Sequence, residues 1–392
     1  MSLNHTPASE RIHIGIFGKR NAGKSSLINA ITGQSLAIVS EIKGTTTDPV
    51  LKSMELLPLG PVVLIDTPGI DDEGDLGELR VKKAYQMLNK TDVAILVVDA
   101  SVGLTNEDEQ ILERIRAKGI SCLVVMNKSD LLQNHNDLED TIWVSAKTGY
   151  NITLLKEKIA EGAKQENVAK KVVGDLLAPF DLVVLVVPID ESAPKGRLIL
   201  PQQQTIRDIL DAGATAIVVK DTELEETLNK LVCKPKMVIT DSQVFGKVAK
   251  IVPKDVPLTS FSILMARYKG DLQAVVEGAH VLDKLQDGDK ILISEGCTHH
   301  RQCNDIGTVK LPTWIREHTQ KELQFEFTSG TEFPDDLTKY QLIIHCGGCM
   351  LNEREMKYRV KCAVDQEVPM TNYGIAIAHM KGILTRSVES FK

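Results

Sequence analysis

The sequence predicts an α/β protein of three consecutive domains with mostly parallel sheets. Short β-branched and aliphatic runs alternate with helical patterns along the chain, and most runs are continuously apolar, as in strands covered on both faces. A glycine-rich loop follows the first run and precedes a helix. Breaks at Glu161–Gly174 and between Thr259 and Gly270 divide the chain into domains 1–168, 169–265 and 266–392.

The expected strands follow from these apolar runs, and each is separated from the next by a turn signal or a helical segment. They are Ile12–Phe17, Val62–Ile65, Val93–Val98, Cys122–Met126, Ile142–Val144, Leu182–Val187, Thr215–Val219, Met237–Ile239, Ile291–Ser294 and Leu342–His345.

Composition limits the possible classes of function. The 392 residues carry a formal net charge of −7, which argues against general nucleic-acid coating. The longest apolar runs, Val93–Val98 and Leu182–Val187, are far shorter than the ~20 residues that span a bilayer, and Met1–Arg11 is polar without a signal-peptide core. Seven cysteines are too few for a disulfide scaffold. We therefore expect a cytoplasmic protein that binds neither nucleic acid nor membrane.

The first strand leads into a phosphate-binding motif. Gly18-Lys19-Arg20-Asn21-Ala22-Gly23-Lys24-Ser25 matches GxxxxGK[ST] between Ile12–Phe17 and a helical run. Its backbone N–H groups and the helix N-terminus favour phosphate oxygens. We expect Lys24 to reach the β- and γ-phosphates and the Ser25 hydroxyl to bind Mg²⁺. The first domain is thus predicted to be a P-loop nucleotide-binding domain.

Two further segments complete a predicted magnesium and γ-phosphate site. Asp66-Thr67-Pro68-Gly69 follows the strand Val62–Ile65, so that Asp66 would hold Mg²⁺ through water and the Gly69 N–H would bond the γ-phosphate. The threonine-rich segment Gly44–Asp48 contains the candidate for a second hydroxyl ligand of Mg²⁺, for which Thr46 is chosen, with Thr45 beside it.

The base is predicted to be guanine. Asn127-Lys128-Ser129-Asp130 follows the strand Cys122–Met126, and the Asp130 carboxylate would accept hydrogen bonds from guanine N1–H and the 2-amino group, a pair that adenine lacks. Ser145-Ala146-Lys147 offers the Ala146 N–H to guanine O6. The four motifs resemble a translation-factor-related GTPase domain. Nucleotide-binding residues are therefore predicted at Gly18, Asn21, Ala22, Gly23, Lys24, Ser25, Ser26, Thr45, Thr46, Asp66, Gly69, Asn127, Lys128, Asp130, Ser145, Ala146 and Lys147.

Ile70 follows Gly69 where a water-orienting glutamine is found in Ras-type GTPases. Catalysis is therefore predicted to be slow and to depend on Lys24, Asn21 and Gly69. Asn21 in the phosphate loop resembles the potassium-activated GTPases, such as the tRNA-modification family, and this resemblance implies that its amide holds K⁺ against the phosphates. The alternative is that Asn21 only caps the loop.

A second site is predicted in the last quarter of the chain. Cys297-Thr298-His299 follows the strand Ile291–Ser294, and His345-Cys346-Gly347-Gly348-Cys349 continues the strand Leu342–His345. Both segments therefore lie beyond strand carboxyl ends, where they can converge. A nearby helix N-terminus is expected to lower the pKa of the Cys349 thiol. Three cysteines suit a four-iron, four-sulfur cluster with one iron lacking a cysteine, a Cys₃His zinc site, or a redox pair.

Cys-x-His followed by His-Cys-x-x-Cys, downstream of a GTPase domain, resembles the FeFe-hydrogenase maturation GTPase HydF family over all three segments. The resemblance implies a scaffold or carrier that receives a di-iron precursor of the H-cluster and delivers it to apo FeFe-hydrogenase. It implies GTP/GDP, Mg²⁺, K⁺ and a 4Fe-4S cluster as cofactors, radical-SAM maturation enzymes as further partners, and a homodimer formed by the middle domain. The implied cluster ligands are Cys297, Cys346 and Cys349, with His299 and His345 as weak ligands or supporting donors.

The competing hypothesis is a potassium-dependent GTPase of tRNA modification or ribosome assembly that carries a structural zinc site. The remaining cysteines are interpreted as structural: Cys303 and Cys362 lie outside the motif, and Cys122 and Cys233 are expected to be core thiols. Asp305 and Cys303 are the residues outside the motif that could approach the cluster.

Overall fold

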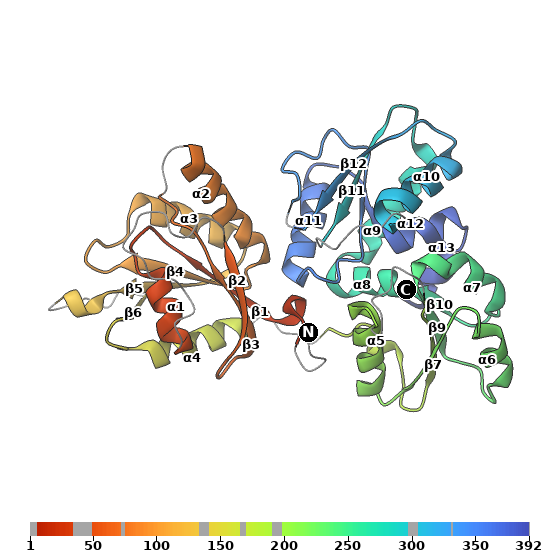
Figure 1. Cartoon of the computed structure of the whole chain (residues 1–392), viewed down its shortest axis with the longest axis horizontal. Coiled ribbons are helices and arrows are strands. Elements are labelled where there is room, and N and C mark those ends of the chain that lie inside the picture. The colour runs from red at the N-terminus through yellow and green to blue at the C-terminus, as the bar shows by residue number, and fades with distance from the viewer. Residues whose placement is uncertain are drawn as a thin grey trace. The chain divides into compact units, whose positions relative to one another are not determined.

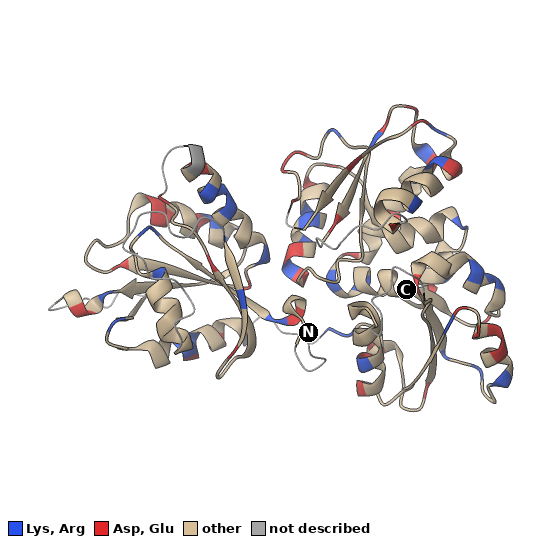
Figure 2. Ribbon diagram, in the orientation of Figure 1, with Lys and Arg blue, Asp and Glu red and all other residues tan. Residues whose placement is uncertain are grey.

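The structure is a computed structural model that describes residues 6–33, 49–71, 75–132, 141–164, 170–189, 198–296, 305–330 and 332–391. It divides into two compact units, Met1–Val168 and Ala169–Lys392. Each unit is an α/β structure, and Figure 1 shows one sheet in the first unit and two in the second. Lys and Arg are interspersed with Asp and Glu on the helices of both units (Figure 2).

The first unit contains a six-stranded sheet in the order β2-β3-β1-β4-β5-β6, in which β2 is antiparallel and the other strands are parallel. One face is covered by α1 and α4 and the other by α2 and α3 (Figure 1). Its elements are η1 (Ala8–Glu10), β1 (Ile12–Phe17), α1 (Lys24–Thr32), β2 (Val50–Leu56), β3 (Gly60–Asp66), α2 (Asp75–Met87), η2 (Leu88–Lys90), β4 (Val93–Asp99), α3 (Asn106–Ala117), β5 (Ser121–Asn127), η3 (Ser129–Leu131), β6 (Thr141–Trp143) and α4 (Ile152–Lys164).

The second unit begins with a parallel four-stranded sheet in the order β10-β9-β7-β8. Its elements are η4 (Gly174–Leu176), β7 (Leu182–Val186), α5 (Leu200–Asp211), β8 (Thr215–Val219), α6 (Leu224–Lys230), β9 (Met237–Thr240), η5 (Ser242–Val244), α7 (Phe245–Ile251), β10 (Leu258–Ser260) and α8 (Phe261–Lys269). The sequence-predicted boundary at 265 falls inside α8, and a domain division at that point stays a prediction.

The second sheet of this unit is also parallel, in the order β12-β11-β13-β14. Its elements are α9 (Leu272–Ala279), η6 (His280–Lys284), β11 (Lys290–Glu295), η7 (Ile306–Lys310), α10 (Leu311–Thr319), β12 (Gln324–Ser329), β13 (Leu342–His345), α11 (Glu353–Asp365), β14 (Met370–Asn372), α12 (Tyr373–Met380), α13 (Leu384–Val388) and η8 (Glu389–Phe391). One hydrophobic core contains Val184 of β7 together with Ile293 of β11 and Ile344 of β13, so both sheets bury side chains in it.

The predictions from the sequence include the buried strands but not some shorter or more polar strands. Each of the ten expected strands is present, and β1, β8 and β13 have the predicted bounds. The strands that were not expected are β2, β10, β12 and β14. β2 and β12 are edge strands with partly exposed side chains, so they carry charged and polar residues and lack a continuous apolar run.

Candidate nucleotide and cysteine sites

The phosphate loop is built between β1 and α1. Gly18 has φ 141° and Gly23 has φ 93°, conformations that residues with a Cβ rarely adopt. A Cβ on Gly23 would lie 2.2 Å from the Asn127 amide nitrogen. The Lys24 ammonium is buried and donates hydrogen bonds of 2.7 Å to the carbonyls of Gly18 and Lys19. Those carbonyls hold the lysine over the loop, where a phosphate would lie.

Ser25 and Asp66 come together as a magnesium site requires. The Ser25 hydroxyl lies 3.5 Å from Asp66 Oδ2. Asp66 Oδ1 is buried and makes no hydrogen bond within the described part of the chain, and burial raises the pKa of this carboxyl in spite of nearby Lys24. A buried carboxylate oxygen beside a hydroxyl is a hard donor pair that fits Mg²⁺. Thr45 and Thr46 lie outside the described residues.

The base-recognition segments are tied to the phosphate loop. The Asn127 amide donates to the Ala22 carbonyl at 3.0 Å, and its oxygen accepts from the Ala146 N–H at 3.1 Å. Asp130 accepts a 2.6 Å hydrogen bond from the Ser145 hydroxyl. Asp130 is exposed, so its carboxylate is held in place without being buried.

The other predicted nucleotide residues lie around this frame. Lys128 donates to Asp99 at 2.6 Å. Burial acts to raise the pKa of Asp99, but hydrogen bonds from Lys128 and Ser101 outweigh it and leave that pKa below its usual value. Ser26 lies in the first turn of α1, and Lys147 is exposed next to Ala146.

The segment after β3 contacts the phosphate loop directly. A Cβ on Gly69 would lie 2.5 Å from Arg20 Cγ, and Asp71 accepts a 2.7 Å hydrogen bond from the Arg20 N–H. Ile70 is buried in the core that contains Phe17 and Ile65, so it offers no polar group to a water molecule. Asn21 is exposed in the phosphate loop with φ 60°.

The cysteine loop follows β13 in the second unit. The Cys346 sulfur accepts hydrogen bonds from the Gly296 N–H at 3.1 Å and the Gly348 N–H at 3.4 Å. Gly296 directly follows β11, so this contact joins the end of β11 to the cysteine loop after β13. N–H donors of this kind commonly surround sulfur atoms that bind a metal. Cys297 and His299 lie outside the described residues.

The pKa of the Cys349 thiol differs from the one that the sequence predicted. Its thiol is largely buried, and burial raises its pKa even though the Lys269 ammonium and backbone hydrogen bonds act in the opposite direction. The expectation of a pKa lowered by a helix N-terminus is therefore wrong for this protein, because desolvation is the larger effect. A bound metal ion would supply the positive charge that this thiolate lacks.

His345 is placed as a support for the loop. Its side chain is fully buried, Nδ1 lies 2.7 Å from the Cys346 carbonyl, and Nε2 lies 3.0 Å from Arg359 Nη1. Since arginine is only a donor, Nε2 accepts and Nδ1 carries the proton. Burial, followed by the charge of Arg359, lowers the pKa of His345 to about 3. Both ring nitrogens are engaged, which suits the supporting role that was one of the two expected for His345, and its role at a cluster stays a prediction.

Two buried cations that the sequence did not single out hold the loop. Lys269, at the end of α8, is 2% exposed and donates to the carbonyls of Cys349 at 3.0 Å and Leu351 at 2.8 Å. Arg359, on α11, is 1% exposed and also donates to the Gly330 carbonyl at 2.6 Å and to Glu355 at 3.0 Å. The signal in the sequence is a lysine at the end of the apolar face of α8, and an arginine four residues after a glutamate on the buried face of α11.

Acidic groups also lie close to the cysteine loop. Glu295 is buried and accepts a 3.1 Å hydrogen bond from the Tyr373 hydroxyl. Burial, Cys346 and Glu295 together raise the pKa of Tyr373 well above its usual value. Asp305, which was expected as a possible neighbour of the cluster, accepts hydrogen bonds from the N–H groups of Gly307 and Thr308 as the cap of η7.

Three segments of the chain match known protein families. Residues 172–270 match the hydrogen maturase F dimerization domain, and residues 273–390 match the hydrogen maturase F tetramerization domain. The chain belongs to the HydF family. Residues 13–128 match the 50S ribosome-binding GTPase family, so this HydF-family chain has a GTPase domain at its N-terminus and oligomerization domains after it.

The curated relatives match the GTPase part of the HydF-family chain. GTPase Der of Kosmotoga olearia is 33% identical over 179 residues, which are 40% of this chain and 40% of the relative. The tRNA modification GTPase MnmE of Nitrosospira multiformis is 36% identical over 160 residues, which are 39% of this chain and 35% of the relative. The chain therefore spans two fifths or less of these relatives.

A solved structure of Era in complex with MgGDPNP and 16S ribosomal RNA nucleotides is a weaker likeness. It is 22% identical and has a TM-score of 0.36, over 58% of this chain and 90% of that one. Within the described residues, every helix is too short or too polar to cross a bilayer.

Proposed function

We propose that this HydF-family protein binds and slowly hydrolyses GTP in its first unit and carries an iron–sulfur centre in its second. The centre receives a di-iron precursor of the H-cluster as cargo for apo FeFe-hydrogenase. The observation that supports this proposal best is the cysteine loop after β13, in a chain whose residues 172–270 and 273–390 match the two HydF oligomerization families. Radical-SAM maturation enzymes are the proposed source of the precursor.

The proposed GTP chemistry uses groups that the chain places around the phosphate loop. Lys24 compensates the charge of the β- and γ-phosphates, Ser25 and Asp66 hold Mg²⁺, with Thr46 as the second hydroxyl, and the Gly69 N–H contacts the γ-phosphate. K⁺ supplies positive charge beside the phosphates, and Asn21 holds it. Ile70 is apolar, so we propose that hydrolysis is slow without K⁺.

The proposed 4Fe-4S centre is held by Cys297, Cys346 and Cys349. Gly296 and Gly348 donate to the Cys346 sulfur, and Lys269 places a positive charge beside Cys349. The N–H donors support Cys346 as a cluster ligand, and the charge of Lys269 partly offsets the burial that raises the pKa of Cys349. His299 remains a candidate ligand, and His345 orients Cys346 through its carbonyl. Three thiolates leave one iron without cysteine, which suits a centre that accepts and releases cargo.

The test is reconstitution of the full chain with iron and sulfide, followed by iron content, electron paramagnetic resonance and GTP turnover on one preparation. We expect Cys346→Ser and Cys349→Ser to lose the cluster signal and the ability to activate apo hydrogenase, while GTP turnover is kept. Cys362→Ser, on α11, is the matched control and should keep the cluster. A Cys346→Ser protein with full iron and an unchanged signal would falsify the proposed centre.

The alternative is a tRNA or ribosome GTPase with a structural zinc site. The metal content of the same preparation distinguishes it from the cluster carrier. A colourless protein that contains stoichiometric zinc and no iron after anaerobic reconstitution would support it. The two HydF-specific matches favour the cluster carrier.

A further inference from the structure

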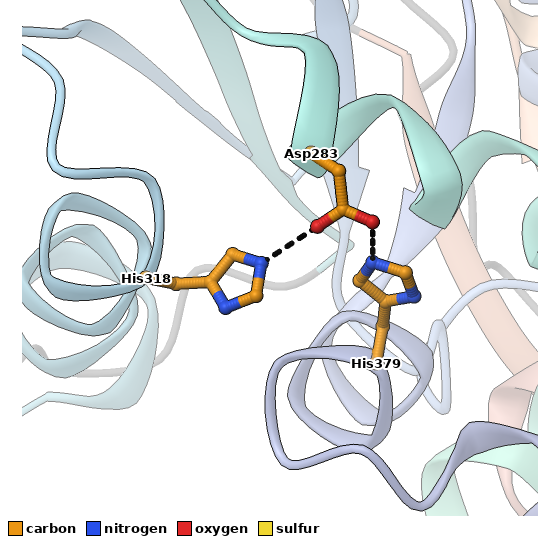
Figure 3. Close-up of side chains that lie close together, drawn as sticks. All are labelled: Asp283, His318 and His379. Carbon is orange, nitrogen blue, oxygen red and sulfur yellow. Dashed lines mark hydrogen bonds and ion pairs between the residues drawn. The ribbon is translucent and has the colours of Figure 1, made fainter.

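A group of metal-binding side chains lies in the second unit apart from the cysteine loop. Asp283 of η6, His318 of α10 and His379 of α12 point toward one another from three elements (Figure 3). Asp283 Oδ1 lies 2.9 Å from His318 Nε2, and Asp283 Oδ2 lies 2.9 Å from His379 Nε2. The three ligand atoms all lie within 4.8 Å of one another.

We propose that Asp283, His318 and His379 form a binding site for a divalent transition-metal ion of the zinc class. Two imidazole nitrogens and one carboxylate oxygen are a ligand set that such ions prefer over Mg²⁺ or Ca²⁺. Tetrahedral zinc with bonds of about 2.0–2.2 Å separates its ligand atoms by about 3.3 Å. The two 2.9 Å spacings, which run to different oxygens of Asp283, need to widen slightly, and the other separations, which lie within 4.8 Å, need to adjust to the same value.

The local electrostatics favour a cation at this place. His318 and His379 each lie in the last turn of their helix, and helix carboxyl ends carry partial negative charge. Arg316 is the cation nearest to His318 in α10, and it donates to the Leu323 carbonyl at 3.3 Å and lies over the Phe325 ring. Its charge is thus engaged by other groups.

The site has room for a further ligand. The side chain of Asp283 is 54% exposed, while those of His318 and His379 are 27% and 12% exposed. An ion held there is therefore accessible to water or to an external ligand. His280, also on η6, stands edge-on to His379 with ring centroids 5.2 Å apart, so it is a protein candidate for a fourth ligand.

This site is separate from the cysteine centre. Tyr373 at the start of α12 contacts Glu295 near the cysteine loop, and His379 lies six residues further along the helix. At 1.5 Å per residue, that is about 9 Å along the axis. The proposed metal site therefore does not depend on whether a cluster is bound at the cysteine loop.

The competing role is structural, because the two hydrogen bonds alone would join η6, α10 and α12. Asp283→Asn separates the roles. An asparagine amide still forms hydrogen bonds with imidazole, but its neutral oxygen is a poor ligand for zinc. Glu317→Gln, a carboxylate-to-amide change at the exposed residue beside His318, is the matched control.

The experiment titrates Zn²⁺ into the full chain by calorimetry, with Cys297, Cys346 and Cys349 changed to Ser and the nucleotide site filled with GDP and Mg²⁺. We expect one Zn²⁺ per chain at the site and a loss of affinity of at least about 10-fold in Asp283→Asn, His318→Ala and His379→Ala. Glu317→Gln should bind as the parent does. Co²⁺ should give visible d–d bands without thiolate charge transfer.

Thermal unfolding supplies the second readout. Saturating Zn²⁺ should raise the midpoint of the parent and of Glu317→Gln, and it should leave that of Asp283→Asn unchanged. Equal Zn²⁺ affinity in Asp283→Asn and its parent, or only millimolar binding in the parent, would overturn the proposal. A loss of stability in His318→Ala without any difference in Zn²⁺ affinity would identify the group as a structural hydrogen-bond network.

Discussion

The nucleotide site and the cysteine loop are held by different means. The phosphate loop is held by backbone groups and by residues of one contiguous motif. Lys24 donates to carbonyls that are only five and six residues away. The cysteine loop is held by Lys269, which donates to a carbonyl 80 residues later in the chain, and by Arg359, which contacts a carbonyl 29 residues earlier and a histidine on another element. A site built from a short motif tolerates change around it, whereas a site supported by buried ions depends on distant residues.

The largest expected effect tests the buried support of the cysteine loop. Arg359→Leu should lower the free energy of unfolding of the second unit by about 3–5 kcal/mol, because it removes one member of a buried ion pair with Glu355. Urea unfolding followed through Trp314 in a Trp143→Phe background measures it. Lys361→Ala, which breaks an exposed pair with Asp365 on the same helix, is the control and should cost at most about 0.5 kcal/mol. Equal losses in the two variants would contradict the comparison.

A substitution in the nucleotide site should change the rate of GTP hydrolysis more than the free energy of unfolding. Lys24→Ala removes a positive charge from the γ-phosphate and should lower GTP turnover at least about 100-fold, the usual effect of losing one charge-stabilising donor. Iron content should not change, because the lysine and the thiols belong to different units. Single-turnover hydrolysis and iron content, measured on one sample, check both statements. Loss of iron in this variant would show that the sites are not independent.

A smaller effect concerns the proposed cation beside the phosphates. K⁺ should raise GTP turnover over Na⁺ by at least about tenfold, corresponding to about 1.4 kcal/mol of transition-state stabilisation. Asn21→Ala should remove this difference and leave GDP affinity close to that of the parent, since Asn21 is exposed and its backbone remains. Turnover in matched K⁺ and Na⁺ buffers measures it. Equal rates in the two salts for the parent protein would exclude a potassium role for Asn21.

A further expected effect is a dependence of stability on pH that is carried by His345. Its pKa is about 3 in the folded chain, below the usual 6.5. Below about pH 6.5 the unfolded chain therefore binds one proton more than the native one, and stability falls as the pH falls from 6.5 toward 3. The loss is at most about 1.4 kcal/mol per pH unit. Comparing urea midpoints of the Trp143→Phe protein at pH 7 and pH 5 with those of a His345→Gln variant isolates this slope, which the variant should lack.

The difference between the two sites also explains what the sequence could predict. The GTPase domain was predicted because its motifs are short and follow buried strands, and those strands are continuous apolar runs. The individual nucleotide-binding residues stay predictions. The support of the cysteine loop was missed because Lys269 and Arg359 become meaningful only when α8 and α11 pack against it. The same limit applies to the Asp283, His318 and His379 group, whose members are separated by 35 and 61 residues.

Single cysteines illustrate the limit further. Cys122 lies in a buried strand, and burial raises its pKa to about 12, in line with the expected core thiol. Cys233 was expected to be a core thiol as well, and it is exposed, because the chain leaves α6 before it and enters β9 after it. Proximity to an apolar run in the sequence does not determine whether a residue in a turn is buried or exposed.

Lys269 has a consequence for how the chain can be divided. It belongs to the segment that matches the dimerization domain, but its ammonium is enclosed by carbonyls of the segment that matches the tetramerization domain. A fragment that begins at residue 273 would therefore lose the donor from the Cys349 and Leu351 carbonyls and expose the base of the loop. The two segments match separate families, but a fragment that keeps the cysteine loop intact has to include Lys269 with the tetramerization segment, as the compact unit 169–392 does.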